Sequence, residues 1–208
     1  MTHSDTTPKG VIFVMIGPGG AGKNAIMRAI IQQLNNVSQL ATATTRPMRE
    51  DEKQGREHLF ISLGEFKQMI ADEALLEYQE VTPNRFYGIP RQSILDSLQN
   101  REIRIADIEV LGAQELVKAF PDHVVQIFVT VPGATLVEKL AILKARMEQR
   151  DDTTQIEERL IRAKTLEFPY QDQCDYVVIN DNLSHATELV SQIIEKEIKQ
   201  RGLVGELS

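Results

Sequence analysis

The chain has 208 residues, enough for one α/β domain with a sizeable core and room for insertions. Its net charge of −7 and pI of about 5.2 argue against a dominant basic surface, so no nucleic-acid partner is expected. The single cysteine, Cys174, excludes an internal disulfide and fits a reducing compartment. Residues 1–9 are polar and resemble no secretory signal, and no apolar run reaches the roughly 20 residues that span a bilayer. We therefore expect a cytoplasmic protein without a membrane partner.

The most informative stretch covers residues 11–34. Val11 to Ile16 form an apolar run that predicts a strand, and the glycine-rich segment GPGGAGKN follows at 17–24. Apolar residues then recur on one helical face, at Ile26, Ile30 and Leu34. This order of strand, glycine loop and helix nearly matches the phosphate-binding loop G-x-x-x-x-G-K-[ST]. An ordinary glycine-rich turn is the alternative.

The chemistry of a polyphosphate explains the residues of this loop. Glycines leave the backbone N–H groups open to the anion and permit positive φ angles. Lys23 adds a positive charge for the β- and γ-phosphates. Asn24 stands where a Ser or Thr hydroxyl normally binds Mg²⁺, and its carboxamide oxygen can also ligate a hard cation. The residues predicted to contact ATP here are Gly17, Gly19, Gly20, Ala21, Gly22, Lys23 and Asn24.

Residues 41–100 interrupt the alternation of strands and helices. Short strands are predicted at 40–45, 58–62 and 74–81, and a fourth extended segment at 86–90. A charged loop, a helix over 64–72 and a second helix after residue 90 separate or follow them. We interpret this block as an inserted subdomain and not as part of the main sheet.

The alternation resumes after residue 100. Strands are predicted at 103–108, 124–131 and 175–180, with helices at 113–120, from about 134, and from 184 onward. Segment 144–162 is dense in charge and is interrupted at 151–154. This pattern predicts a parallel sheet with helices on both faces. The predicted core comprises residues 10–40 and 101–200, with flexible termini at 1–9 and 201–208.

Two further signals carry chemistry. Asp107 lies near the end of an apolar strand, where an acid in a phosphate-loop protein holds Mg²⁺ directly or through water. A solvent-facing acid at the end of a strand is the alternative. Arg46 and Arg49 lie three residues apart on a predicted loop, a spacing that suits two guanidinium groups clamping one phosphate. Taken alone, loop arginines are usually solvated.

Taken together, these motifs resemble the guanylate kinases from about residue 10 to about residue 194. The resemblance rests on VIFVMIGPGGAGK, ATTRPMR, HLFIS, LLEYQEV, FYGIP, IADIEVLGAQ and DYVVINDNL, in this order. It implies a phosphate-loop core, an inserted acceptor-binding subdomain over 41–100 and a helical lid over about 144–160. It also implies Mg²⁺-dependent transfer of a phosphoryl group from ATP to GMP, which gives ADP and GDP.

The resemblance assigns roles in the acceptor site to individual residues. It places Arg46, Arg49 and Tyr87 on the acceptor phosphate, and Thr42 and Glu77 at the base. A carboxylate suits guanine, because the N1–H and the 2-amino group donate side by side. Adenine has an unprotonated N1 there and would leave the charge unpaired.

The resemblance also assigns residues around ATP. It places Asn180 and Asp181 near the adenine and the lid arginines Arg146, Arg150 and Arg159 on the transferring phosphates. Cations on a closing lid stabilise charge on the phosphoryl group and exclude water. A solvated charged helix is the alternative for these arginines. No side-chain base is required, because a phosphate with a second pKa of about 6 is largely dianionic at pH 7.

Several residues depart from the family pattern near the acceptor. His58 stands where a tyrosine is expected, Ile89 where a small hydroxyl residue is expected, and Glu109 replaces an aspartate near the guanine edge. We expect an altered acceptor preference, and an affinity that depends on pH near the His58 pKa of ~6.5. Alternatives are a kinase of another small phosphate ester and a non-catalytic binding module; the complete glycine loop argues against the module. A monomer or a homodimer is expected.

Overall fold

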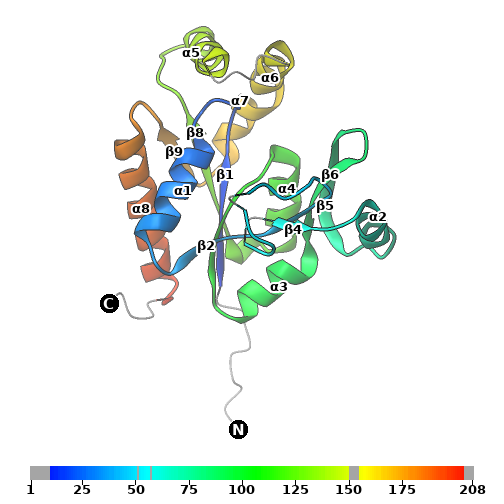
Figure 1. Cartoon of the computed structure of the whole chain (residues 1–208). Helices are drawn as coiled ribbons and strands as arrows, with labels where there is room; N and C mark the ends of the chain where they lie inside the picture. Colours follow the sequence, from blue (N-terminus) through cyan, green and yellow to red (C-terminus); the bar gives the residue numbers. More distant parts are fainter. Residues whose placement is uncertain (1–9, 51, 57, 150–154, 204–208) are drawn as a thin grey trace.

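The computed structural model describes residues 10–50, 52–56, 58–149 and 155–203. Its centre is a five-stranded parallel sheet in the order β2-β7-β1-β8-β9 (Figure 1). The parallel sheet predicted from the sequence is thereby confirmed. Strand β2 was not predicted. The strands are β1 (Val11–Ile16), β2 (Val37–Gln39), β7 (Ile103–Asp107), β8 (Val124–Thr130) and β9 (Tyr176–Ile179).

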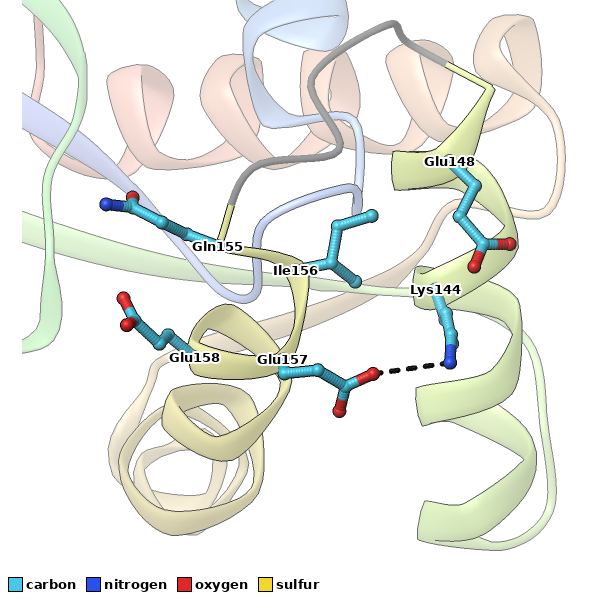
Figure 2. Close-up of a pocket in the computed structure, with 6 residues that line it drawn as sticks. All are labelled: Lys144, Glu148, Gln155, Ile156, Glu157 and Glu158. Carbon is cyan, nitrogen blue, oxygen red and sulfur yellow. Dashed lines mark hydrogen bonds and ion pairs between the residues drawn. The ribbon is translucent and has the colours of Figure 1, made fainter.

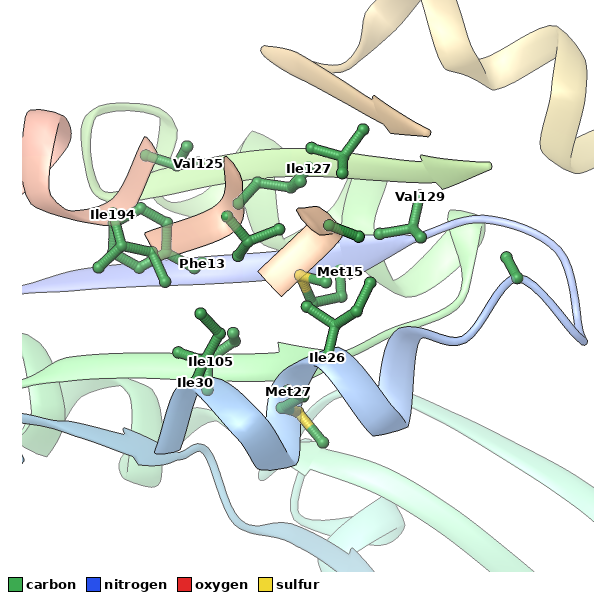
Figure 3. Packing of buried hydrophobic residues seen from close by; sticks show 14 of the residues in the cluster. Phe13, Met15, Ile26, Met27, Ile30, Ile105, Val125, Ile127, Val129 and Ile194 are labelled. Atoms are coloured by element: carbon green, nitrogen blue, oxygen red, sulfur yellow. The ribbon is translucent and has the colours of Figure 1, made fainter. Parts of the chain in front are cut away.

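Strand β1 lies in the middle of this sheet and is buried on both faces, which explains its continuous apolar sequence. Phe13 and Met15 point toward α1 (Lys23–Gln33) and α8 (Leu183–Gln200), where they meet Ile26, Ile30 and Ile194 (Figure 3). The alternate residues of β1 point to the opposite face. Both cores therefore converge on the strand that leads into the glycine loop.

The opposite face is covered by α3 (Arg91–Gln99), α4 (Val110–Ala119) and α7 (Phe168–Tyr170). Phe168 of α7 packs against Phe128 of β8, with ring centroids 6.1 Å apart. A π-helix, η2 (Ala163–Glu167), leads into α7, and short 3₁₀ helices η1 (Pro121–His123) and η3 (Gln171–Gln173) complete this layer. Elements η2 and α7 thus lead the chain from α6 back to the parallel sheet.

A separate four-stranded sheet of order β4-β3-β6-β5 lies beside the parallel sheet (Figure 1). Strands β3 and β4 are parallel and the other pairs are antiparallel. Helix α2 (Leu63–Ala71) packs Phe66 into this sheet and begins with a Ser62–Glu65 capping box. This sheet agrees with the short strands predicted for the region, whereas its assignment to an inserted acceptor-binding subdomain stays a prediction. Its strands are β3 (Thr42–Thr44), β4 (His58–Phe60), β5 (Leu75–Thr82) and β6 (Arg85–Pro90).

Helices α5 (Leu136–Glu148) and α6 (Ile156–Arg162) lie beyond the carboxyl ends of the parallel strands (Figure 1). Arg150, the predicted interruption at 151–154 and the predicted flexible segments 1–9 and 204–208 lie outside the described residues. Of the predicted C-terminal tail, residues 201–203 are described, and Leu203 is buried in the core that contains α8. No helix in the described ranges is long and apolar enough to cross a membrane.

Candidate active site

The glycine loop connects β1 to α1 in a conformation that side chains would obstruct. Gly17, Gly20 and Gly22 have φ angles of 134°, 87° and 96°, which favour glycine. A Cβ atom on Gly17 would lie 2.2 Å from the carbonyl oxygen of Val129, and one on Gly22 would lie 2.2 Å from Asn180 Nδ2. Glycine is therefore needed for the close packing of this loop against Val129 and Asn180. The loop leads directly into the N-terminus of α1, which can bind an anion.

Asn180, predicted near the adenine, lies against the outside of this loop. It is buried, and its Nδ2 donates a hydrogen bond of 2.7 Å to the carbonyl oxygen of Ala21. Arg146 of α5 donates a 2.9 Å bond from NH2 to the backbone oxygen of Asn180. The neighbouring Asp181 is half-exposed and pairs with His185 at 3.2 Å, which holds the pKa of its carboxyl below the usual range. Asn180 therefore links the glycine loop to the first lid helix.

Lys23, predicted to bind the ATP phosphates, contacts the glycine loop and the predicted metal ligand. We call this group of residues the donor side. The Lys23 Nζ donates a 2.6 Å bond to the carbonyl oxygen of Gly17 and lies 3.7 Å from Asp107 Oδ1. Desolvation raises the pKa of the Asp107 carboxyl, and the nearby Lys23 ammonium opposes that rise. Asn24 occupies the exposed first turn of α1. The loop, its lysine and the strand-end acid thus form one charged site.

Helices α5 and α6, which contain the predicted lid, approach the same loop. A Cβ on Gly19 would lie 3.8 Å from Arg159 Cδ and 3.9 Å from Met147 Sδ, so α5 and α6 both reach the glycines. The two helices are joined by an ion pair of 3.3 Å between Lys144 and Glu157. Figure 2 shows this pair at a hollow of about 440 Å³ between the helices, lined by Lys144, Glu148, Gln155, Ile156, Glu157 and Glu158.

Arg46, predicted to bind the acceptor phosphate, is buried and contacts partners on several sides. We call the predicted acceptor residues and their partners the acceptor side. The Nε of Arg46 donates a 3.1 Å bond to the Tyr87 hydroxyl, and the guanidinium makes two bonds, of 2.6 and 2.5 Å, to Glu52. The Arg46 Cζ lies 5.3 Å above the Phe60 ring. The two hydrogen bonds from the Arg46 guanidinium lower the pKa of the Glu52 carboxyl to about 2. Two predicted phosphate ligands, Arg46 and Tyr87, therefore lie in direct contact.

Thr42 and His58 extend this group along neighbouring strands. Thr42 Oγ1 lies 2.7 Å from His58 Nδ1, within hydrogen-bond distance. The His58 ring meets Tyr87 edge-on, with centroids 5.8 Å apart. Arg49 is exposed; its backbone N–H donates to Glu52 at 2.9 Å. Pairing of β3 with β4 and β6 brings Thr42, His58 and Tyr87 together from segments separated by 16 and 29 residues in the numbering.

The predicted base-reading residues lie where β5 meets α4. Glu77 Oε2 is 3.0 Å from the point that a Cβ on Gly112 would occupy. Glu109 immediately precedes α4, and its carboxylate contacts the guanidinium of Arg162 from the end of α6. Burial and the neighbouring Glu109 raise the pKa of Glu77, whereas Arg162 lowers it. The two predicted acids thus influence each other across the start of one helix.

Comparison with known proteins identifies the family. The guanylate kinase family model matches residues 9–197. The chain belongs to the guanylate kinase family. A guanylate kinase of Maricaulis maris is 34% identical over 195 residues, covering 93% of this chain and 86% of that protein. One of Bradyrhizobium diazoefficiens is 35% identical over 201 residues, covering 95% and 89%.

The fold agrees with that of a solved guanylate kinase. The crystal structure from Anaplasma phagocytophilum aligns with a TM-score of 0.63 at 21% identity, over 95% of this chain and 97% of that one. The fold class predicted from the sequence is therefore confirmed. The roles of individual residues remain predictions, although the structure brings most of them into three groups: the glycine loop with Lys23 and Asp107, the residues around Arg46, and the pair Glu77 and Glu109.

Sequence reasoning missed three charged residues of these groups: Glu52, Arg162 and Glu167. Glu167 lies in η2, is 13% exposed, and its Oε1 is 3.7 Å from Arg162 Nε. Burial raises its pKa to about 7, against the effects of Lys23 and Arg162, while Glu109 and Asp107 reinforce the shift. Its apolar neighbours Leu166 and Phe168 could have indicated burial. No sequence pattern indicated a role for Arg162, because its partner Glu109 lies 53 residues away.

Proposed function

We propose that this chain transfers the γ-phosphoryl group of ATP to GMP, giving ADP and GDP. Membership of the guanylate kinase family supports the reaction. The observation that best supports GMP as the acceptor is the position of the Glu77 carboxylate, which lies against α4 at Gly112 and near Glu109. We call Glu77, Glu109 and the first turn of α4 the acceptor wall. A carboxylate at this wall matches the paired N–H donors of guanine and has no such partner on a sugar phosphate.

The donor side supports the role of the glycine loop. Its open amides would bind the ATP phosphates, and Lys23 would exchange the carbonyl oxygen of Gly17 for a phosphate oxygen. Arg159 and Arg146, on the two lid helices, would bring positive charge to the transferring group. Catalysis would then consist of positioning and electrostatic stabilisation, with the acceptor phosphate as its own nucleophile.

The residues at the donor side also fit a hydrated Mg²⁺. The described residues contain no group of three or more His, Cys, Asp or Glu arranged to hold a metal ion. Mg²⁺ in kinases uses one or two protein ligands together with waters and substrate phosphates, so a single acid suffices. Asp107 and the Asn24 carboxamide would hold it. When bound, Mg²⁺ neutralises charge on the β- and γ-phosphates.

On the acceptor side, Arg46 and Tyr87 would receive the acceptor phosphate, with His58 and Arg49 beside them. The Arg46 guanidinium is already oriented by Glu52, so little side-chain entropy would be lost on binding. We propose residues 41–100 as the acceptor-binding subdomain and about 144–160 as the lid. A cytoplasmic location follows from the proposed substrates.

The test is ADP release from Mg-ATP with GMP, dGMP, AMP, IMP, UMP, CMP and ribose phosphates as acceptors. We expect GMP to be preferred. We also expect Glu77→Gln to raise the KM for GMP about 10- to 100-fold, because one of two charged acceptor atoms is lost. Glu80→Gln is the matched control, since Glu80 lies on the same strand and is exposed. Preference for another acceptor, or ATP binding without turnover, would contradict the proposal.

A further inference from the structure

Arg162 has no role in the reaction described so far, although it contacts the acceptor wall. It is the last residue of α6, and its guanidinium bonds to Glu109. Its Nε lies 3.7 Å from Glu167 and has no hydrogen-bond partner in the part of the chain that the structure describes. One cation of the lid region therefore reaches two carboxylates from different elements.

The first turn of α4 explains why Arg162 also acts on Glu77. Glu109 precedes the helix and Gly112 follows three residues later, so both lie on one side of the first turn. Glu77 packs against Gly112 with its Oε2 3.0 Å from the Cβ position. Glycine inside a helix costs about 1 kcal/mol relative to alanine, and here it provides the space that this carboxylate occupies. Two acids thus face one helix end, and Arg162 contacts one of them, Glu109.

The charge state of Glu77 decides which base fits. An ionised carboxylate accepts both guanine donors, whereas a protonated one presents an O–H and an acceptor, which matches adenine N1 and its amino group. Two carboxylates at close range favour protonation of one of them. Glu109 and Arg162 are the charged groups that act on Glu77, in opposite directions. The nearby cation therefore favours the form of Glu77 that reads guanine.

We propose that Arg162 is a positioning residue for acceptor selection: its guanidinium holds Glu109 in place at the start of α4, beside Gly112, where the carboxylate of Glu77 receives the acceptor base. This inference rests on the proposed function, because it assumes that Glu77 faces the base. Arg162 belongs to α6, so the same contact joins the second lid helix to the acceptor wall.

The test compares Arg162→Gln and Arg162→Lys with the parent enzyme, using GMP and AMP between pH 5.5 and 8.5. We expect Arg162→Gln to raise the KM for GMP about five- to tenfold, the size expected for one lost charge interaction of this kind. kcat and the KM for ATP should change less than about twofold. The rise of the GMP KM on acidification should begin at a higher pH, and the preference for GMP over AMP should fall.

Two further variants separate positioning from folding. Arg162→Lys keeps the charge but loses the planar fork, so we expect an intermediate KM and a pH profile close to that of the parent. Lys164→Gln removes the same charge from an exposed position two residues away and should match the parent. If Arg162→Gln does not fold, the GMP KM of Arg162→Lys relative to Lys164→Gln decides the question.

An unchanged GMP KM and pH profile in Arg162→Gln would overturn the inference. So would equal losses for GMP, AMP and ATP together with a lower Tm, because that pattern indicates a structural role. The proposed function fails separately, if the parent enzyme does not use GMP.

Discussion

The donor and acceptor sides of the site are built in different ways. The donor side is made mostly of backbone: glycines at positive φ, the start of α1 and a hydrogen bond from Asn180 to the loop. The acceptor side is made of charged side chains that hold one another, such as Arg46 with Glu52 and Arg162 with Glu109. A substitution should therefore act on the donor side through shape and on the acceptor side through charge.

This difference also separates fixed from adjustable parts of the molecule. The loop follows a strand that is buried on both faces, so its geometry is set by the two main cores. The acceptor group depends on ion pairs, one within a single loop (Arg46 with Glu52) and one between distant segments (Arg162 with Glu109), and exchange of one partner can alter it without disturbing a core. Departures such as His58 and Glu109 occur on this second side, although Asn24 shows that the donor side also varies.

The largest expected effect comes from the charged centre of the donor side. Lys23→Ala should lower kcat about 10³-fold, because it removes the cation that we propose to contact the transferring phosphate. Binding of GMP should change little, since Lys23 lies on the donor side of the site. Steady-state kinetics and direct titration with GMP measure both quantities. A variant within tenfold of the parent kcat would show that the loop amides and the lid suffice.

The next effect tests whether backbone shape controls the donor side. Gly22→Ala places a Cβ 2.2 Å from Asn180 Nδ2 and forces alanine to a φ of 96°. We expect a loss of about 2–3 kcal/mol in the free energy of unfolding and a raised KM for ATP. Denaturation and ATP titration provide the measurements.

The double variant Gly22→Ala/Asn180→Ala is the control for this clash. It removes the atom that the new Cβ meets but keeps the strained φ, so it should recover only part of the combined loss. Full additivity of the two single losses would show that the clash contributes nothing.

The two sides also differ in how well the sequence predicts them. The strand, the glycine loop and α1 are contiguous, and a phosphate site demands glycine and lysine at fixed spacing, so local pattern was sufficient. The four-stranded sheet was predicted as short strands, but its pairing of β3 with both β4 and β6 was not, because register depends on distant segments. Arg162 was missed for the same reason, because its partner Glu109 lies 53 residues away. Glu52 and Glu167 have partners five or six residues away, but a charged loop and a helix end do not show from sequence which charges pair.

A smaller effect should appear on the acceptor side and depend on pH. Glu52→Gln breaks the buried pair with Arg46, and at pH 7 we expect a loss of about 2 kcal/mol in the free energy of unfolding. The pKa of Glu52 is about 2 in the folded protein, below the usual value. Its contribution is therefore present above about pH 4.5 and declines as the pH falls toward 2.

Urea denaturation of the parent and of Glu52→Gln between pH 3 and 7 measures this difference. The gap between the two proteins should be constant near neutrality and narrow in acid. Glu50→Gln, on the same loop and exposed, should show no gap. A gap that stays constant down to pH 3 would mean that lost packing around Arg46, and not the ion pair, causes the destabilisation.

The last expected effect has the opposite pH dependence and concerns Glu167, which lies between the two sides. Burial raises the pKa of Glu167 to about 7, so its neutral form favours the folded state. The stability that this proton provides is complete below about pH 4.5 and is lost as the pH rises through 7. Glu167→Gln keeps a neutral side chain of the same shape, so it should nearly match the parent at pH 4.5. At pH 8 it should exceed the parent's free energy of unfolding by about 2–3 kcal/mol, because a folded pKa of about 7 lies well above the ordinary value of 4.5. Thermal denaturation without nucleotide at both pH values measures the difference. Equal stability at pH 8 would show that Lys23 and Arg162 already compensate the charge of Glu167, and the two sides would then share one balanced charge network instead of meeting at an uncompensated acid.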